Sequence, residues 1–455
     1  MSERAKEYYR IATWVLVALC GLYAVALRLY LAWDLPLWLD ESWTAIISAA
    51  PTFQSFGRQI WLDINAPLHY LLMWVWPFKS SLGLKLPSLL FLLAASALAV
   101  WWRPPGLDRP AGVFWGLLLL LWQPGLSLFI DARYYALLFF LGTAQTIAFL
   151  KLLDQPRRRR AILWTGIATL AILTHYFAAV PTAVQGLYFL WYHKGRAVRC
   201  WPALLTTLPG LAWGFIHLPR LRLYARPENN WYQTLLPVEL PDHLAWPVAG
   251  TAYIAVGVIA IALAFRSRER IAPHVLTVAG LAFASVAMFV AAGLVVPFFA
   301  ARYLLPTAPP ILLAIAVSIR SAGYLPMALW YFVNLGGVVG VGRQLDEQAN
   351  YGLEKPARLL PEARTVTWMM DYEGSKNLDR GQMEAMLADA FRRNHRSVRP
   401  RWSNDLFGGD GLIYFYPPDQ QADVAAIKAR WRCIDLVSHD HRGVVCAPRH
   451  ERERQ

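Results

Sequence analysis

Long apolar stretches recur along this chain and constrain its fold more than any other feature. A helix that crosses the roughly 30 Å hydrocarbon core of a bilayer needs about 17 to 25 apolar residues. Eleven stretches meet this criterion, at 11–33, 84–102, 111–130, 134–152, 161–177, 178–193, 200–218, 246–265, 273–294, 303–319 and 323–342. We divide the run at 161–193 in two because Thr174-His-Tyr and Pro181 interrupt it. The pattern predicts an all-α polytopic membrane protein.

The composition supports the same class. Of the 455 residues, 56% are hydrophobic and only 16% are charged, whereas soluble chains carry about 25% charged residues. These values exclude a soluble globular enzyme and a disordered chain. The net charge of +14 is not accompanied by a basic nucleic-acid-binding motif, and membrane proteins collect Lys and Arg in cytoplasmic loops. We therefore expect membrane lipids, and no nucleic acid, as partners.

The loop charges give the expected orientation. The apolar stretch 67–79 has thirteen residues, which as a helix would reach only about 20 Å, so we predict a helix on the membrane surface. With this helix excluded and the N-terminus in the cytoplasm, the inner segments hold seventeen Lys and Arg residues and the outer loops hold eight. Counting 67–79 as a span would expel the run Arg157–Arg160 to the outside. The positive-inside rule therefore favours the surface helix.

This topology predicts large outer segments. They are the loop at about 34–83, a second loop at 219–245, and the whole chain after about 343. The chain then divides into a membrane module at 1–342 and an outer C-terminal domain at 343–455, whose composition is more polar.

The C-terminal domain has patterns of its own. Residues 365–370 and 411–416 are typical of strands, and 379–393 has helical spacing with an acidic start and a basic end. We predict a small α/β domain. Because it would lie in an oxidising compartment, we also predict a disulfide between Cys433 and Cys446. Cys20 and Cys200 lie in or beside apolar runs and are expected to be packing residues.

Several charged residues fall at the predicted outer interface. Asp40 and Glu41 stand between Trp38 and Trp43; acids in such surroundings tend to be paired or functional, although both could simply face water at a helix end. Desolvation raises a carboxylate pKa and helps a base to act near neutral pH. Asp131 and Arg133 start the fourth span, where the alternative is a helix N-cap with a snorkelling arginine.

Distant parts of the chain add more candidates on the same side. The segment 63–70 contributes Asp63 and His69. Arg302 and Tyr303 begin a span, where a guanidinium suits a lipid phosphate as well as simple interfacial anchoring. For His175 the default expectation is a hydrogen-bonded packing residue.

Acids and an arginine on one face of a many-helix body suit one kind of chemistry. A base activates an acceptor, while cations or a metal hold the leaving phosphate of a membrane-soluble donor. The sequence contains no P-loop, Rossmann glycine pattern, GxSxG elbow or zinc-ligand spacing that would favour another reaction.

Six segments in order resemble the signature segments of the polytopic GT-C glycosyltransferases, especially bacterial relatives of protein O-mannosyltransferases and of the lipid A aminoarabinose transferase. The resemblance covers about residues 10–320. The segments are Trp38-Leu-Asp-Glu-Ser, Asp63-Ile-Asn-Ala-Pro-Leu-His-Tyr, Leu86-Pro-Ser-Leu-Leu, Asp131-Ala-Arg-Tyr-Tyr-Ala, Thr174-His-Tyr-Phe and Arg302-Tyr-Leu-Leu-Pro.

The resemblance implies an integral-membrane glycosyltransferase of the bacterial inner membrane, which moves a hexosyl or pentosyl group from a polyprenyl-phosphate donor at the periplasmic or external face. It places the catalytic acids at Asp40 and Glu41 and the donor phosphate near Arg302, with Asp131 as a further site acid. Metal dependence varies among GT-C enzymes, so a divalent cation stays open as a cofactor, with Asp40 and Asp131 as candidate ligands. The resemblance leaves the sugar and the acceptor open.

Two other functions remain as alternatives. A polytopic transporter or flippase of lipid-linked substrates would also carry buried charges, although transporters usually show internal repeats, and this sequence shows none. A membrane scaffold would leave the coincidence of the outer acids unexplained. We expect acceptor choice to lie in the second outer loop, around residues 229–232, and in the C-terminal domain.

Overall fold

A computed structural model gives the structure of the chain. It describes residues 3–35, 37–225, 234–248, 273–322, 354–360, 363–370, 380–394, 396, 398–403, 405–406, 408–416, 421–437 and 442–448. The expected spans at 246–265 and 323–342, and residues 229–232, lie largely or wholly outside this part of the chain.

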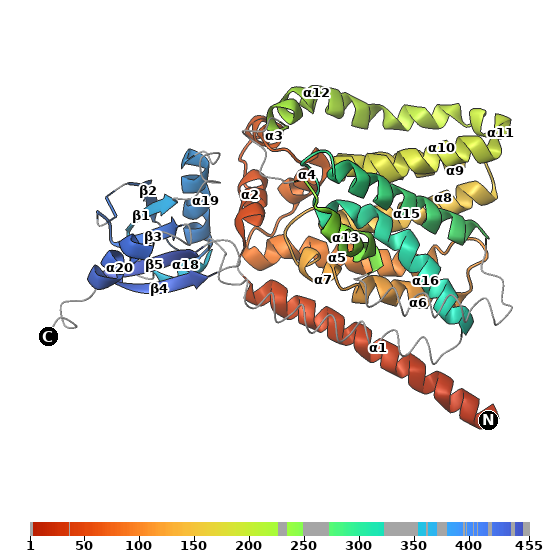
Figure 1. Ribbon diagram of the computed structural model, residues 1–455, viewed down its shortest axis with the longest axis horizontal. Coiled ribbons are helices and arrows are strands. Elements are labelled where there is room, and N and C mark those ends of the chain that lie inside the picture. Colours follow the sequence, from red (N-terminus) through yellow and green to blue (C-terminus); the bar gives the residue numbers. More distant parts are fainter. Residues whose placement is uncertain are drawn as a thin grey trace. The chain divides into compact units, whose positions relative to one another are not determined.

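The chain divides into two compact units, and both are drawn in Figure 1. The first unit contains residues 1–30, 57–71 and 86–342. The second contains residues 31–56 and 72–85 together with the C-terminal residues 343–455. The segment that carries Asp40 and Glu41 is therefore grouped with the C-terminal domain.

Helices dominate the described residues before 323. They are α1 (Glu3–Asp34), α2 (Leu39–Ser48), α3 (Phe53–Leu62), α4 (Pro67–Val75), α5 (Ser81–Trp101), α6 (Arg109–Leu121), α7 (Gly125–Leu128), α8 (Tyr135–Asp154), α9 (Arg158–Thr174), η1 (Tyr176–Ala178), α10 (Ala179–His193), α11 (Gly195–Val198), η2 (Trp201–Thr207), α12 (Leu208–Tyr224), η4 (Pro237–Glu239), α13 (Leu240–Ala245), η5 (Trp246–Val248), α15 (Pro273–Gly293), η6 (Ala301–Thr307) and α16 (Ala308–Ala322).

Within the described residues, five helical segments are long and apolar enough to cross a membrane. They are Arg10–Asp34, Ser81–Trp101, Tyr135–Asp154, His274–Gly293 and Ala301–Arg320. In the third and fifth segments, 89% of the apolar window is buried inside the protein, whereas in the first segment 39% is buried. α8 and α16 are therefore central helices of the bundle, and α1 is peripheral. The expected total of about eleven spans is not confirmed by these five.

Two predicted helices end earlier than the apolar pattern indicated. The surface helix expected at 67–79 is α4, which stops at Val75, and the span expected at 111–130 stops at Leu121. A proline follows each end, Pro77 and Pro124. Proline lacks a backbone N–H and disfavours a helical conformation in the residue before it. The single helix predicted over 111–130 is therefore wrong.

The division of residues 161–193 is confirmed. α9 ends at Thr174, and His175 has an extended backbone with φ −158° and ψ 125°. The single turn η1 then leads into α10. The break places His175 at the end of a helix, where its buried side chain can contact other elements.

The C-terminal domain is a mixed sheet with helices on both faces. Its helices are α18 (Glu354–Leu359), α19 (Arg380–Arg393) and α20 (Gln421–Arg430), and its strands are β1 (Thr365–Met370), β2 (Arg399–Trp402), β3 (Gly411–Tyr416), β4 (Trp431–Val437) and β5 (Arg442–Pro448). The strand order is β2-β1-β3-β5-β4. β1 is parallel to β2 and β3, and β5 is antiparallel to β3 and β4. This domain confirms the predicted strands at 365–370 and 411–416.

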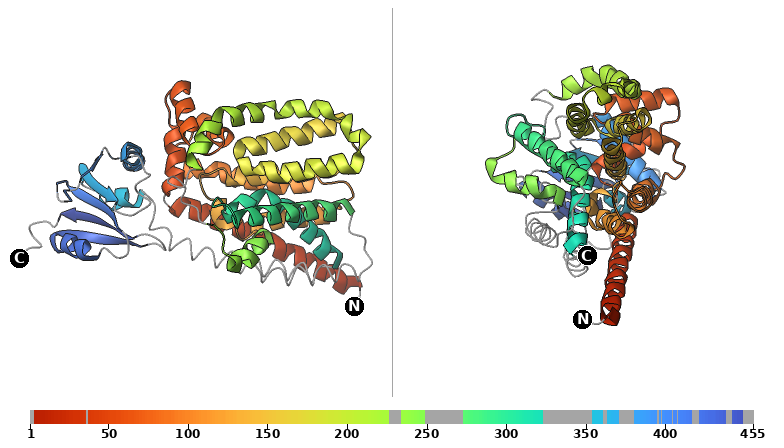
Figure 2. Two further views of the ribbon diagram at one scale, coloured as in Figure 1. Left: turned by 45° about the horizontal axis from the view of Figure 1, so that its top comes forward. Right: turned by 90° about the vertical axis from the view of Figure 1, so that its right-hand side faces the viewer.

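Side chains alternate between two cores along β3. Ile413 and Phe415 pack with α19, whereas Leu412 and Tyr414 pack with α20. All six residues of β3 are buried, as expected for a strand that is covered on both faces. Figure 2 shows α19 and α20 on opposite sides of the sheet.

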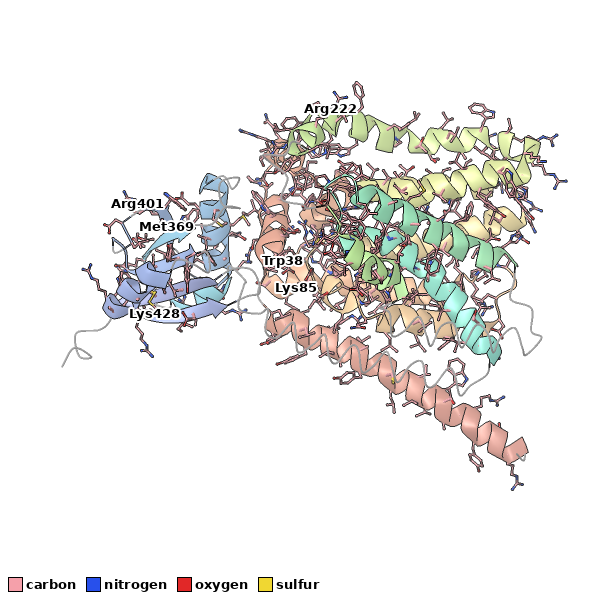
Figure 3. All side chains as sticks on the ribbon, viewed as in Figure 1. Trp38, Lys85, Arg222, Met369, Arg401 and Lys428 are labelled. Atoms are coloured by element: carbon pink, nitrogen blue, oxygen red, sulfur yellow. A yellow bond between two sulfur atoms is a disulfide. The ribbon has the colours of Figure 1, made fainter. Side chains whose placement is uncertain are left out.

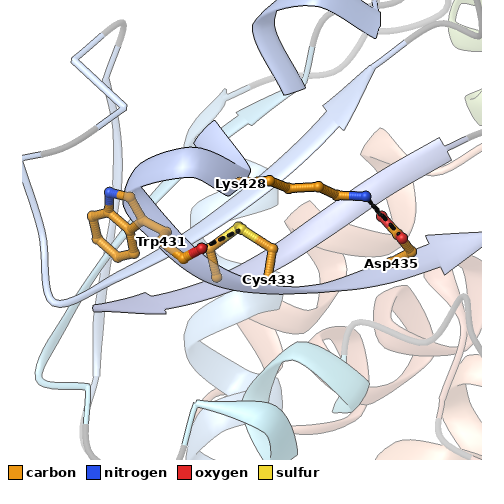
Figure 4. Close-up of a disulfide and its surroundings, with 5 residues drawn as sticks. Lys428, Trp431, Cys433 and Asp435 are labelled. Carbon is orange, nitrogen blue, oxygen red and sulfur yellow. Dashed lines mark hydrogen bonds and ion pairs between the residues drawn. A yellow bond between two sulfur atoms is a disulfide. The ribbon is translucent and has the colours of Figure 1, made fainter. Parts of the chain in front are cut away.

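The structure contains the disulfide that we expected from the sequence. Cys433 of β4 and Cys446 of β5 are directly opposite each other in the antiparallel register and are bonded. Nearby, Lys428 of α20 forms an ion pair with Asp435 of β4 at 2.7 Å (Figure 4). Cys20 and Cys200 are free thiols and are buried, which agrees with a packing role.

Candidate active site

The two neighbouring acids of α2 lie in different environments. Glu41 is fully buried, and its Oε2 accepts a hydrogen bond from the Trp38 N–H at 3.0 Å, which caps the start of the helix. Its Oε1 lies 3.9 Å from Nζ of Lys85, which is also buried. Asp40 is partly exposed. Glu41 therefore acts on the structure of α2, and Asp40 is the acid of the pair that solvent reaches.

Lys85 had no assigned role in the sequence analysis. It lies in the first turns of α5 and is labelled in Figure 3. Its Nζ donates to the carbonyl oxygen of Leu35 at 2.7 Å. A single lysine within an apolar helix does not by itself indicate a role in a site. Its partners Leu35 and Glu41 are more than forty residues away in the chain, so only the folded structure brings them together.

Asp63 belongs to a closed hydrogen-bond network. Its Oδ1 accepts from the backbone N–H of Asn65 at 2.8 Å and from the Asn65 side chain at 2.7 Å. Its Oδ2 accepts from the Tyr70 hydroxyl at 2.9 Å. The same hydroxyl accepts from Nη1 of Arg133 at 3.1 Å. Tyr70 therefore connects two residues predicted for the site, Asp63 and Arg133, although it had no predicted role of its own.

His69 is buried beside this network. Burial lowers the pKa of His69 to about 3, and the charge of Arg133 contributes to the lowering. The imidazole is therefore neutral near pH 7. It contributes to the site as a neutral ring and not as a cation.

The segment that carries Asp131 is not a helix cap. α8 begins at Tyr135, and its N-cap position is Tyr134. The backbone oxygen of Asp131 accepts a hydrogen bond from Ser88 of α5 at 2.6 Å. Arg133 is nearly buried, and its guanidinium lies 5.4 Å from the ring centroid of Tyr134. The alternative explanation of Asp131 as an N-cap residue is therefore wrong.

An aromatic cluster forms around His175. Its ring centroid lies 4.7 Å from that of Tyr134, 5.1 Å from that of Tyr303 and 5.4 Å from that of Phe177. Among the described residues, Nδ1 of His175 has no hydrogen-bond partner. The expectation that His175 is a hydrogen-bonded packing residue is therefore not met at this nitrogen.

Two arginines adjoin the aromatic cluster. The guanidinium of Arg302 lies 5.9 Å from the Tyr303 ring, and the charges of both Arg302 and Arg133 act on the His175 ring and on Tyr134. The chain thus gathers segments near residues 70, 133, 175 and 302 in one place. Two guanidinium groups beside buried rings form an environment that attracts an anion.

α12 supports the loop that holds Asp63. His217 is buried, and its Nδ1 accepts from the Tyr176 hydroxyl at 2.6 Å while its Nε2 donates to the carbonyl oxygen of Trp61 at 3.1 Å. Arg220 donates to the carbonyl oxygen of Leu62 at 2.9 Å. His217 had no predicted role, because its hydrogen-bond partners lie in two other elements, η1 and α3.

No group of three or more His, Cys, Asp or Glu side chains that could hold a metal ion occurs in the described part of the chain. Asp40 and Asp131 belong to different units. The divalent cation suggested for these two acids stays a prediction.

The fold defines a class, a mostly helical protein of the polytopic membrane type with a small C-terminal α/β domain. No protein-family model matches the sequence, and no curated protein sequence matches it. The similarity is found among solved structures.

Those structures include ArnT, the lipid A aminoarabinose transferase, from Cupriavidus metallidurans. ArnT bound to undecaprenyl phosphate superposes with a TM-score of 0.57 at 15% identity, over 94% of this chain and 97% of that chain. ArnT in the apo state gives a TM-score of 0.56 at 16% identity, over 96% and 98% of the two chains. At this identity the similarity shows the fold, and it confirms the resemblance predicted from the six sequence segments.

Proposed function

We propose that this protein transfers a sugar from a polyprenyl-phosphate donor to an acceptor at the outer face of the membrane. One observation carries the proposal: Arg133 and Arg302, which are far apart in the sequence, adjoin the same aromatic cluster around His175. This chain has a fold similar, over 94% of its own length, to that of ArnT bound to undecaprenyl phosphate.

The two arginines suit the phosphate of the donor. Guanidinium groups make charge-assisted hydrogen bonds to phosphate oxygens and remain charged at any physiological pH. As the sugar leaves, negative charge grows on the phosphate, and cations already in place stabilise it without reorganisation. Tyr303 and His175 form the wall of this site. Tyr70 links Arg133 to Asp63 and holds it in position.

Asp40 is the proposed base. It accepts the proton of the acceptor hydroxyl as that oxygen bonds to the anomeric carbon, and the bond from this carbon to the phosphate oxygen breaks. The polyprenyl phosphate leaves with the electron pair of that bond. Glu41 supports this role from its cap position and does not itself take the proton.

The orientation belongs to the same proposal. We place the N-terminus in the cytoplasm and the C-terminal domain, 343–455, in the periplasm or outside the cell. The Cys433–Cys446 disulfide supports this placement, because disulfides persist in oxidising compartments.

Purified protein tests the reaction directly. The assay supplies labelled polyprenyl-phosphate sugars with an envelope fraction as the acceptor source and measures release of the carrier phosphate. We expect release by the wild type and loss of at least about 100-fold in kcat for Asp40→Asn, since a general base contributes about 10²- to 10⁴-fold.

Asp34→Asn is the matched control, because Asp34 is an exposed acid at the end of α1. It should retain wild-type turnover. Full turnover by Asp40→Asn would exclude Asp40 as the base. Movement of the intact donor across a vesicle membrane without release of carrier phosphate would favour the flippase alternative.

A further inference from the structure

We propose that the C-terminal domain positions the catalytic acid, because α19 holds α2, the helix that carries Asp40. This inference rests on the proposed function, in which Asp40 is the base. It assigns Trp43 and Ile46 as positioning residues, and it makes the C-terminal domain part of the transfer machinery in addition to any role in acceptor choice.

The contact between α2 and the C-terminal domain is apolar. Trp43 and Ile46, both partly buried, pack against the core formed by α19 and the sheet. This core includes Met383, Met386 and Leu387 of α19. Trp43 and Ile46 are three residues apart and therefore lie on one side of the helix.

Other elements contact the two ends of α2. At its start, Glu41 caps the helix and lies beside Lys85. Just beyond its end, the carbonyl oxygen of Ala50 accepts a hydrogen bond from the indole of Trp74 at 2.9 Å. These contacts fix the two ends of α2. The face that carries Trp43 and Ile46 depends on the C-terminal domain.

Asp40 is next to that face. It precedes Trp43 by three residues, so the two side chains are neighbours on the helix surface. A helix of ten residues is too short to be stable on its own in water, and its orientation therefore depends on tertiary packing. Loss of the packing against α19 would shift Asp40, and a displacement of about 1 Å can reduce a rate about 100-fold.

The test removes the contact between α2 and α19 and leaves Asp40 unchanged. The double variant Trp43→Ala, Ile46→Ala in the full-length protein should lower kcat about 10- to 100-fold while the KM for the donor stays unchanged. Amide hydrogen exchange within α2, from Asp40 to Ser48, should become faster in the same variant. Trp43→Phe keeps an aromatic ring on α2 packed against α19, and this variant should retain most of the wild-type kcat and of the wild-type exchange protection.

Ile434→Ala is the control, since Ile434 is an exposed apolar residue of β4 in the same domain. It should change neither kcat nor exchange in α2. If the double variant does not fold, Trp43→Leu provides a milder loss with the same two measurements.

Two results would overturn the inference. One is a wild-type kcat in the double variant, and the other is unchanged exchange in α2, whatever happens to kcat. If the wild type itself transfers no sugar, the proposed function fails, whereas exchange in α2 still decides whether α19 holds this helix.

Discussion

Two buried charged residues of this protein, Glu41 and Lys85, compensate each other. Glu41 and Lys85 are both almost fully buried, and each is placed against the other and against backbone groups. Taking two charges out of water costs several kcal/mol per ion, and the pair is tolerated because hydrogen bonds satisfy the remaining atoms. Removing one partner therefore has a larger effect than removing both.

A double-mutant cycle tests this pair. Lys85→Met and Glu41→Gln should each destabilise the protein by about 3–5 kcal/mol, because each leaves one buried charge without its counter-charge. The combined variant should be less destabilised than either single variant. Thermal unfolding in detergent measures the three values, and strict additivity would mean that the pair has no energetic coupling.

His69 predicts a dependence of stability on pH. Its pKa in the folded protein is about 3, below the ordinary value of about 6.5. As the pH falls below about 6.5, the unfolded chain binds a proton that the folded protein excludes, so stability is lost between pH 6.5 and 3. The loss has a slope of at most about 1.4 kcal/mol per pH unit.

His69→Gln should flatten this slope between about pH 6.5 and 5, where few carboxylates titrate. Unfolding temperatures of the wild type and of the variant across this range provide the measurement. Equal slopes in the two proteins would show that the pKa of His69 is the same in the folded and the unfolded state.

At the scale of helices and loops, the ends of helices determine the positions of the candidate site residues. Pro77 and Pro124 end two helices before the apolar pattern does, and the break after Thr174 brings His175 to Tyr134 and Tyr303. α12 then holds the loop before α4 through His217 and Arg220. The site is thus built where helices stop, at backbone groups that side chains from other elements satisfy.

His217→Leu tests the role of α12. The change removes the hydrogen bonds to Trp61 and Tyr176 and leaves buried polar groups without partners, at a cost of about 1–3 kcal/mol. Hydrogen exchange in the loop around Asp63 should rise, while α8 stays protected. Unchanged exchange in this loop would mean that Arg220 and local contacts suffice.

For the whole molecule, the main structural feature is its division into two units. The C-terminal domain is grouped with α2 and with the segment 72–85, so chain order does not match spatial grouping. The domain is also crosslinked, and its stability should depend on the disulfide between β4 and β5.

Cys433→Ser with Cys446→Ser should lower the free energy of unfolding of the C-terminal domain by about 3 kcal/mol, the value for a closed loop of about fifteen residues. The two cysteines are thirteen positions apart. Adding a reductant to this double variant should produce no further change, whereas it should destabilise the wild type. Equal stability in oxidised and reduced wild type would contradict the prediction.

The sequence alone determined the class of protein and much of its local structure. Hydrophobic stretches of helical length predicted a polytopic helical body, and strand patterns predicted β1 and β3, because these signals depend on neighbouring residues and on the membrane as solvent. The GT-C fold was implied by the resemblance of six ordered segments. Most candidate site residues, including Arg133, His175 and Arg302, were named from their positions at the predicted outer interface.

The tertiary structure alone decided how these residues are used. The capping of α2 by Glu41, its ion pair with Lys85, the link from Asp63 through Tyr70 to Arg133, and the docking of α2 on α19 all join residues through packing and hydrogen bonds. Most of these partners are distant in the chain. The polar contacts form because burial makes an unsatisfied charge or polar group costly, whereas the docking of α2 buries apolar side chains. A linear pattern does not say which residues become partners.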